Sequence, residues 1–179
     1  MAGSVWLGEN RRMDLRARLP VFPPTPSERA RAARATLRID GLVAQPLELT
    51  SEAFQTLERA SLVEPFVCDE GWSVPGLRWG GVRLSDVLAL AQPLAAARYV
   101  RAGSGEWVVP VRVCHLARGL VADELNGEPL TIEHGAPWRL VLSGGPCYTN
   151  VKWLDHLELV AEAGEDTARR IAQARLSSR

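Results

Sequence analysis

The sequence lacks a long apolar run, an excess of charge of one sign and a paired arrangement of cysteines. No segment approaches the roughly 18 to 20 consecutive apolar residues that a membrane-spanning helix needs, so we expect no transmembrane segment. Basic and acidic side chains balance at 21 each, which makes nucleic acid a poor partner. The cysteines Cys68, Cys114 and Cys147 are too few and too widely spaced for a disulfide framework or a zinc site. Because no apolar export signal follows Arg11 and Arg12, we expect a cytoplasmic protein.

Common catalytic motifs are missing as well. No GxSxG motif surrounds a serine, and the histidines lie apart from any such nucleophile, which disfavours a serine hydrolase. No GxGxxG or Walker-type glycine loop follows a predicted strand, so nucleotide binding has no motif behind it. The chemistry of this chain must therefore come from other residues.

The chain divides by composition into an arm, a domain and a tail. Arginine and proline crowd residues 1–35, and this composition favours an extended or irregular arm. The arm is either a solvated basic segment or an anchor for an anionic ligand or an acidic partner. Residues 36–161 have the apolar content of one globular domain, and residues 162–179 form a tail with helical spacing of its apolar positions.

Within the domain, hydrophobic periodicity predicts strands and short helices in mixed order. Strands are expected at residues 37–40, 62–67, 98–102, 106–111, 138–142 and 154–160, and helices at 51–60, 84–88 and 113–120. Asn126-Gly127 is the strongest turn signal. Because helices and strands do not alternate regularly, as they would around a parallel sheet, we expect the α+β class.

Cys68 has an unusual setting for an isolated cysteine, which is more often a buried packing residue. It ends an apolar strand and enters a polar turn, residues 69–73, where a scaffold would present a thiolate to a cleft. The neighbouring acids Asp69 and Glu70 disfavour a bare nucleophile, whereas a bound metal cation would deprotonate the thiol. The setting therefore suits a metal ligand better than a nucleophile.

A second cluster of candidate residues lies near the end of the domain. Arg139 closes the segment His134-Gly-Ala-Pro-Trp-Arg139, and Lys152 follows beyond the glycine-rich segment 143–146. An arginine fork and a lysine point charge together suit a phosphorylated cofactor. The alternative is that both are strand-edge charges that face water.

Three stretches of sequence, taken together, carry a resemblance to a known family. They are Phe66-Val-Cys-Asp-Glu-Gly-Trp-Ser73 with Trp79-Gly-Gly-Val-Arg-Leu84, then Asn126-Gly-Glu-Pro-Leu130, then the segment from His134 to Arg139 continuing to Asn150-Val-Lys-Trp153. In this order they resemble the molybdopterin-dependent oxidoreductases of the sulfite oxidase class, especially the bacterial branch that includes the methionine sulfoxide reductase catalytic subunit. The resemblance covers residues 36–160 and implies the mixed-sheet molybdenum-cofactor fold of that class.

By this resemblance, Cys68 supplies the thiolate that binds molybdenum, beside the dithiolene sulfurs of one pyranopterin. The resemblance places six further residues at the cofactor: Ser104, His134, Arg139, Asn150, Val151 and Lys152. The arginine and the lysine would meet the pterin phosphate, because an anionic group needs fixed cations around it.

The implied function is two-electron oxidation or reduction of a small substrate with transfer of an oxygen atom. Electrons would pass to or from a separate protein or carrier. A second hypothesis is a cofactor-binding or interaction module without turnover, because arginines and prolines replace the family's asparagine and tyrosine before the first strand. A third is a thiol-redox protein that pairs Cys68 with Cys114 or Cys147, which their wide spacing disfavours.

Pro146 and Cys147 also depart from the family, which has glycine and tyrosine around this part of its cofactor loop. Cys147 is either a bystander or a second thiol close to the site. We expect a bystander.

Overall fold

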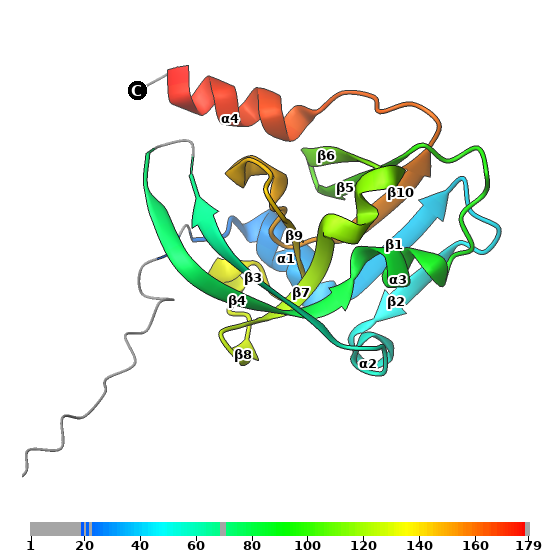
Figure 1. Cartoon of the computed structure of the whole chain (residues 1–179), viewed down its shortest axis with the longest axis horizontal. Helices are drawn as coiled ribbons and strands as arrows, with labels where there is room; N and C mark the ends of the chain where they lie inside the picture. The colour runs from blue at the N-terminus through cyan, green and yellow to red at the C-terminus, as the bar shows by residue number, and fades with distance from the viewer. Residues whose placement is uncertain (1–18, 20, 22, 69–70, 178–179) are drawn as a thin grey trace, which may run out of the picture.

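The chain forms two β-sheets with short helices around them, in a computed structural model that describes residues 19, 21, 23–68 and 71–177 (Figure 1). The first sheet has the order β2 (Leu47–Thr50), β1 (Thr36–Gly41), β10 (His156–Val160), β5 (Tyr99–Ser104), β6 (Trp107–Arg112). The second has the order β3 (Ala60–Val67), β4 (Ser73–Arg83), β7 (Gly119–Leu125), β8 (Glu128–Pro129), with β9 (Arg139–Leu142) paired to β7. The expected α+β class is confirmed.

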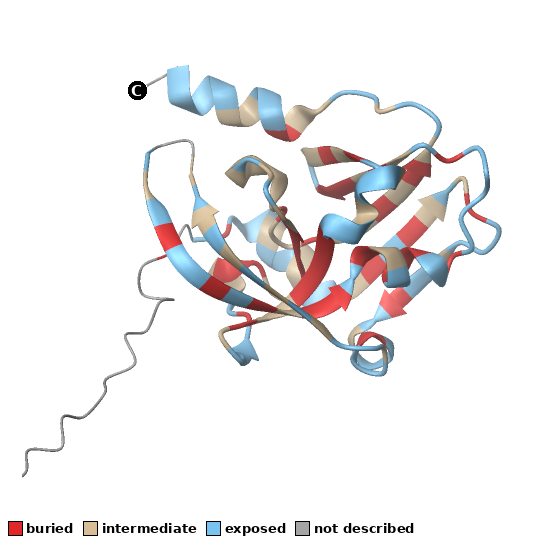
Figure 2. Cartoon of the chain, viewed as in Figure 1, coloured by how far each residue is buried: buried red, intermediate tan, exposed pale blue. Residues whose placement is uncertain are grey.

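The strands alternate inward and outward side chains, as the sequence pattern predicts. In β1, Leu37 and Ile39 are fully buried, while Arg38 faces solvent on the other side of the sheet. In β7, Val121 packs into the core between the two sheets, and Leu120 joins a second apolar cluster on the opposite face. Figure 2 accordingly shows β7 buried along most of its length. The second sheet is therefore covered on both faces.

The helices are short and lie around the sheets. They are α1 (Pro26–Arg34), α2 (Ser51–Gln55), α3 (Leu84–Ala89) and α4 (Thr167–Ser177), with 3₁₀ segments η2 (Val113–Arg118), η3 (Ile132–His134) and η4 (Cys147–Thr149). Within the part of the chain that the structure describes, no helix combines the length and the apolar character that crossing a bilayer would require.

The extended or irregular conformation expected for residues 1–35 is wrong for Pro26–Arg34, which form helix α1. Thr25 caps the helix by accepting a hydrogen bond from Glu28 N–H, and Glu28 reaches back to the Thr25 N–H at 2.7 Å. Pro26 occupies the first turn, where a proline costs the helix no hydrogen bond. Residues 1–18 of the predicted arm lie outside the described residues, and its separation from the domain stays a prediction.

Four strands, β2, β4, β7 and β8, lie where the sequence pattern predicts none, and β4 and β7 are the longest of them. Strand β4 contains Pro75, Gly80 and Gly81, which are typical of loops. Strand β7 begins with four consecutive buried residues, 119–122, which show no polar alternation because both faces of the sheet are buried there. The polar alternation that identifies a half-buried strand is therefore absent from both.

Gly81 lies at a close approach of β4 to β7. A Cβ at this position would overlap the main chain of Val121 and approach Ala122 Cα to 2.7 Å, and neither can move without breaking the strand pairing. We expect Gly81→Ala to lower the free energy of unfolding by about 2–4 kcal/mol in urea denaturation.

The neighbouring glycine provides a matched control. A Cβ at Gly80 would approach the Glu124 Oε2 atom to 2.6 Å, and this atom is the flexible end of a side chain. Gly80→Ala should therefore cost less than about 1 kcal/mol. Equal losses of stability in the two variants would contradict the role assigned to Gly81.

Candidate functional site

Cys68 follows the last residue of β3, at the end of the long curved β3–β4 hairpin (Figure 1). Its N–H donates to Trp72 O at 2.9 Å, and its carbonyl accepts from Gly71 N–H at 3.0 Å. Trp72 stacks on Phe66 with the ring centroids 5.7 Å apart. These contacts hold the half-buried cysteine at the strand end, as predicted; its acidic neighbours Asp69 and Glu70 lie outside the described residues.

A second sulfur lies beside the first. Cys147, the first residue of η4, places its Sγ 3.4 Å from Cys68 Sγ. Cys147 therefore lies close to the candidate site, and the expectation that it is a bystander is wrong. No signal in the sequence could have joined two cysteines that lie 79 residues apart.

Glu64 on β3 ties this strand to the loop that carries Cys147. Its carboxylate accepts hydrogen bonds from the Ser143 hydroxyl and, at 3.1 Å, from Gly144 N–H. The glycine-rich segment 143–146, which the sequence singles out, is therefore positioned by the same strand that positions Cys68. Sequence reasoning missed Glu64, which looks like an ordinary surface acid.

Arg139, at the start of β9, is a buried cation. Its side chain is 3% exposed and lies over the rings of Phe66 and Trp79, with its Cζ 5.2 and 4.9 Å from their centroids. It donates one hydrogen bond to His134 O at 3.2 Å, while its Nε has no hydrogen-bond partner among the described residues. Burial lowers the pKa of Arg139 to about 10, an effect partly offset by the nearby Cys147 sulfur. The interpretation of Arg139 as a strand-edge charge that faces water is wrong.

Lys152 lies close to Arg139. Its Nζ donates to Glu133 O at 2.6 Å. Burial, and secondly the charge of Arg139, lowers the pKa of Lys152 to about 8. Gly135 packs against Lys152 with a positive φ of 109°, a conformation that favours glycine at this close approach. The predicted cationic cluster of the last strands is therefore present.

The other candidate residues have identifiable structural partners. His134 is buried, and its Nδ1 lies 3.0 Å from the Thr131 hydroxyl. Asn150 accepts a hydrogen bond from Leu142 N–H through its Oδ1, and Val151 is fully buried in the core. Ser104, at the end of β5, has a buried Oγ without a hydrogen-bond partner among the described residues. Their roles at a cofactor stay predictions.

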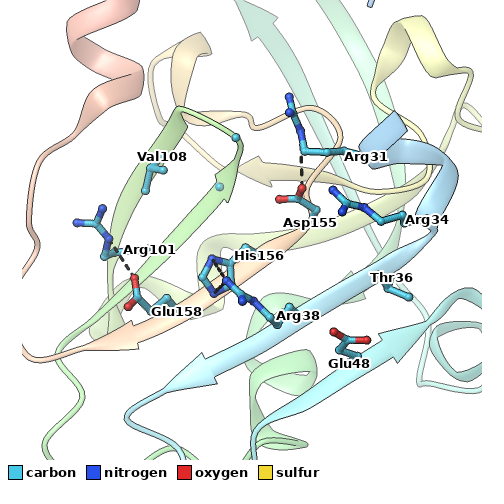
Figure 3. Close-up of a pocket in the computed structure, with 12 residues that line it drawn as sticks. Arg31, Arg34, Thr36, Arg38, Glu48, Arg101, Val108, Asp155, His156 and Glu158 are labelled. Atoms are coloured by element: carbon cyan, nitrogen blue, oxygen red, sulfur yellow. Dashed lines mark hydrogen bonds and ion pairs between the residues drawn. The ribbon is translucent and has the colours of Figure 1, made fainter. Parts of the chain in front are cut away.

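A cavity of about 570 Å³ lies between α1 and the outer face of the first sheet (Figure 3). Much of its charge is paired within the cavity. Arg31 lies 3.7 Å from Asp155, and Arg101 lies 3.3 Å from Glu158. The two neighbouring cysteines and the buried arginine do not line it. The cavity is therefore distinct from the cysteine pair.

The residues around Cys68 fit a ligand that combines anionic oxygen atoms with a soft metal. The buried guanidinium of Arg139 has an unpartnered Nε, and a neighbouring lysine adds a second cation. Thiolate sulfur is a preferred donor for soft metals. In the described ranges, no group of three or more histidine, cysteine, aspartate or glutamate side chains gathers to hold a metal ion.

The low pKa of Lys152 predicts a pH dependence of folding stability. Between pH 8 and 10.5, the unfolded chain binds more protons at this lysine than the folded chain, so the free energy of unfolding rises with pH in this window. Below pH 8 the full cost of the buried charge is present. We expect the cofactor-free protein to gain on the order of 2 kcal/mol between pH 7 and 10 through this group.

Urea denaturation at both pH values, with Lys152→Met beside the unchanged protein, measures this contribution. Other titrating groups contribute to both proteins and cancel in the comparison. The methionine variant should show a smaller rise of stability with pH. Identical rises in both proteins would mean that Lys152 titrates normally in the fold.

Comparison with known proteins finds similarity to oxidoreductases. Residues 23–168 match the family described as the oxidoreductase molybdopterin binding domain. The chain is 33% identical over 129 residues to the "uncharacterized oxidoreductase YuiH" of Bacillus subtilis (strain 168), covering 70% of this chain and 65% of that protein. It is 27% identical over 169 residues to a sulfite oxidase of Arabidopsis thaliana, covering 73% of this chain and 43% of the relative.

Two further matches involve longer proteins. The chain is 29% identical over 157 residues to a nitrate reductase [NADPH] of Leptosphaeria maculans, covering 72% of this chain and 18% of that protein. The sulfane dehydrogenase SoxCD from Paracoccus pantotrophus has a similar fold, with a TM-score of 0.68 and 24% identity over 81% of this chain and 41% of that one. The chain thus spans less than two thirds of the length of these relatives.

Proposed function

Because the chain belongs to the oxidoreductase molybdopterin binding domain family, we propose that it is a molybdenum-cofactor-dependent oxidoreductase with Cys68 as the metal thiolate. The sulfite oxidase class expected from the sequence is confirmed. The likeness to the bacterial methionine sulfoxide reductase branch stays a prediction. The substrate is proposed to be a small molecule, with electrons exchanged through a separate protein or carrier.

One observation carries the proposal: a buried arginine without a carboxylate partner lies next to the cysteine pair. Arg139 forms no ion pair with a carboxylate among the described residues, and its pKa is influenced by the Cys147 sulfur that contacts Cys68. A buried cation is costly unless a ligand or an acid compensates it. An anionic cofactor that reaches Cys68 would provide that compensation.

The residues of this chain would then have distinct tasks. Cys68 would bind the metal, while Arg139 and Lys152 would hold the pterin phosphate by charge-assisted hydrogen bonds. The His134 carbonyl fixes the arginine fork, and the Glu133 carbonyl fixes the lysine. When bound, the cofactor supplies two-electron oxygen-atom transfer, and the protein supplies its orientation and local charge.

Elemental analysis combined with pterin fluorescence after oxidation tests the proposal. Protein from molybdenum-replete cells should contain about one molybdenum and one pterin per chain, since a single thiolate site is proposed. Protein with neither would refute it. Dye-linked oxidation and reduction assays on the loaded sample then separate an enzyme from a binding module without turnover.

A further inference from the structure

The site contains two cysteine sulfurs, although a metal thiolate needs only one. Cys68 Sγ and Cys147 Sγ lie 3.4 Å apart. The third cysteine, Cys114, is exposed on η2. The second sulfur has no task in the proposed function, and its contact with the first therefore needs its own explanation.

The contact is set by the main chain around each cysteine. Cys68 is held in its turn by hydrogen bonds to Trp72 and Gly71, as described above. On the other side, the Cys147 carbonyl accepts from Asn150 N–H at 3.1 Å, and the next carbonyl, of Tyr148, accepts from the Trp107 indole at 3.0 Å. Both backbones are therefore anchored independently of the two thiols.

We propose that Cys68 and Cys147 form a reversible disulfide in the cofactor-free protein, and that this bond must be reduced before the site can be loaded. The proposal rests on the proposed role of Cys68 as the metal ligand. The two sulfurs are already in contact, and a disulfide requires them to close to about 2.05 Å. A sulfur bonded to another sulfur has no thiolate to offer, so the disulfide and the metal-bound state exclude each other.

A peroxide is the oxidant class for this reaction. The Cys68 thiolate attacks one peroxide oxygen, the O–O bond breaks, and the leaving hydroxide takes up a proton to become water. The sulfenic acid formed on Cys68 is then attacked by the Cys147 sulfur, so that the S–S bond forms, the S–O bond breaks and a second water leaves. The two thiols together lose two electrons and two protons, and the peroxide is reduced to two waters.

Protection of the ligand sulfur is the expected benefit. A sulfenic acid that no second thiol captures proceeds to sulfinic acid, which thiol reductants do not reverse. Cys147 lies close enough to capture it first. An empty site would thus survive oxidation in a form that a cellular dithiol can restore.

Peptide mapping of the cofactor-free chain, made in cells that lack molybdopterin, tests the disulfide. Trypsin places the three cysteines on separate peptides, residues 60–78, 113–118 and 140–152. After mild hydrogen peroxide and alkylation of the remaining thiols, we expect the first and third peptides to be joined and the second to be alkylated. Dithiothreitol should separate them. Alkylation of all three peptides after peroxide, with no joined product, would overturn the proposal.

Two variants sharpen the test. Cys114→Ser should behave like the unchanged chain. Cys147→Ser should give no joined peptide and should accumulate sulfinic acid on the peptide with residues 60–78, which dithiothreitol leaves in place. A Cys147→Ser chain that gains no sulfinic acid on this peptide would overturn the protective role assigned to Cys147.

Loading distinguishes this proposal from the proposed function. The metallated pterin released from an unrelated molybdenum enzyme is added to reduced and oxidised chain, and bound molybdenum is measured. Oxidation should lower loading at least about tenfold, and dithiothreitol should restore it, because the ligand must be a free thiolate. Equal loading of both forms would refute the proposal that the disulfide must be reduced before the cofactor binds. A Cys68→Ser chain that binds molybdenum normally would instead refute the metal-ligand role.

Discussion

Cys68→Ser is expected to lower turnover of the loaded protein by about 100-fold or more, equivalent to about 2.7 kcal/mol of lost transition-state stabilisation. The substitution removes the sulfur donor that we propose for the metal. It leaves in place the buried Arg139 and the half-buried Lys152, the cations proposed for the phosphate. Pterin should therefore be retained at least in part. Turnover per chain, molybdenum content and pterin fluorescence should be measured on the same sample.

Cys114→Ser is the matched control, because it makes the same chemical change at an exposed cysteine. It should retain turnover and both components of the cofactor. Full activity in Cys68→Ser would refute the assignment of the ligand. Loss of pterin together with metal would show that the sulfur, and not the cation cluster, dominates cofactor binding.

Arg139→Met is expected to reduce cofactor occupancy at least about tenfold, since a charge-assisted fork to an anion is lost while the side-chain volume is largely kept. The same change should leave the stability of the cofactor-free protein unaltered or raise it by about 1 kcal/mol, because a buried charge is removed. Burial lowers the pKa of Arg139 to about 10, which indicates that keeping this side chain charged costs folding free energy. Molybdenum content and urea denaturation measure the two effects.

Arg112→Met provides the comparison. Arg112 is an exposed arginine at the end of β6, with its Cζ 5.7 Å from the Tyr99 ring centroid. It also contacts an aromatic ring, but it lies on the outside of the first sheet. This variant should change neither molybdenum content nor stability appreciably. Unchanged occupancy in Arg139→Met would exclude the phosphate role.

Much of the site was predictable because its residues carry local signals. Cys68 ends an apolar strand, and the glycine-rich segment 143–146 precedes the second group of conspicuous residues. Helix α1 had a signal as well: Thr25 and Glu28 form a capping box around a proline in the first turn. The abundance of proline just before it favoured an extended arm instead. The positions of these capping residues, and not the composition of the segment, determine the helix.

The parts that could not be predicted depend on contacts between distant segments. The burial of Arg139 results from β9 pairing with β7, which places the guanidinium over two aromatic rings of other strands. The contact between Cys68 and Cys147 likewise results from the loop that Glu64 binds. Neither periodicity nor spacing encodes such contacts, because they arise from the packing of the whole sheet.

The strand order of the first sheet has a consequence for biosynthesis. Strand β10 is the last strand in the sequence, yet it lies in the middle of this sheet, parallel to β1 and antiparallel to β5. While a ribosome is still translating the residues before 156, the β1–β2 and β5–β6 hairpins have nothing to join them. Chains that have not yet reached β10 therefore cannot complete this half of the protein, and we expect insertion of the cofactor to follow emergence of β10 from the ribosome.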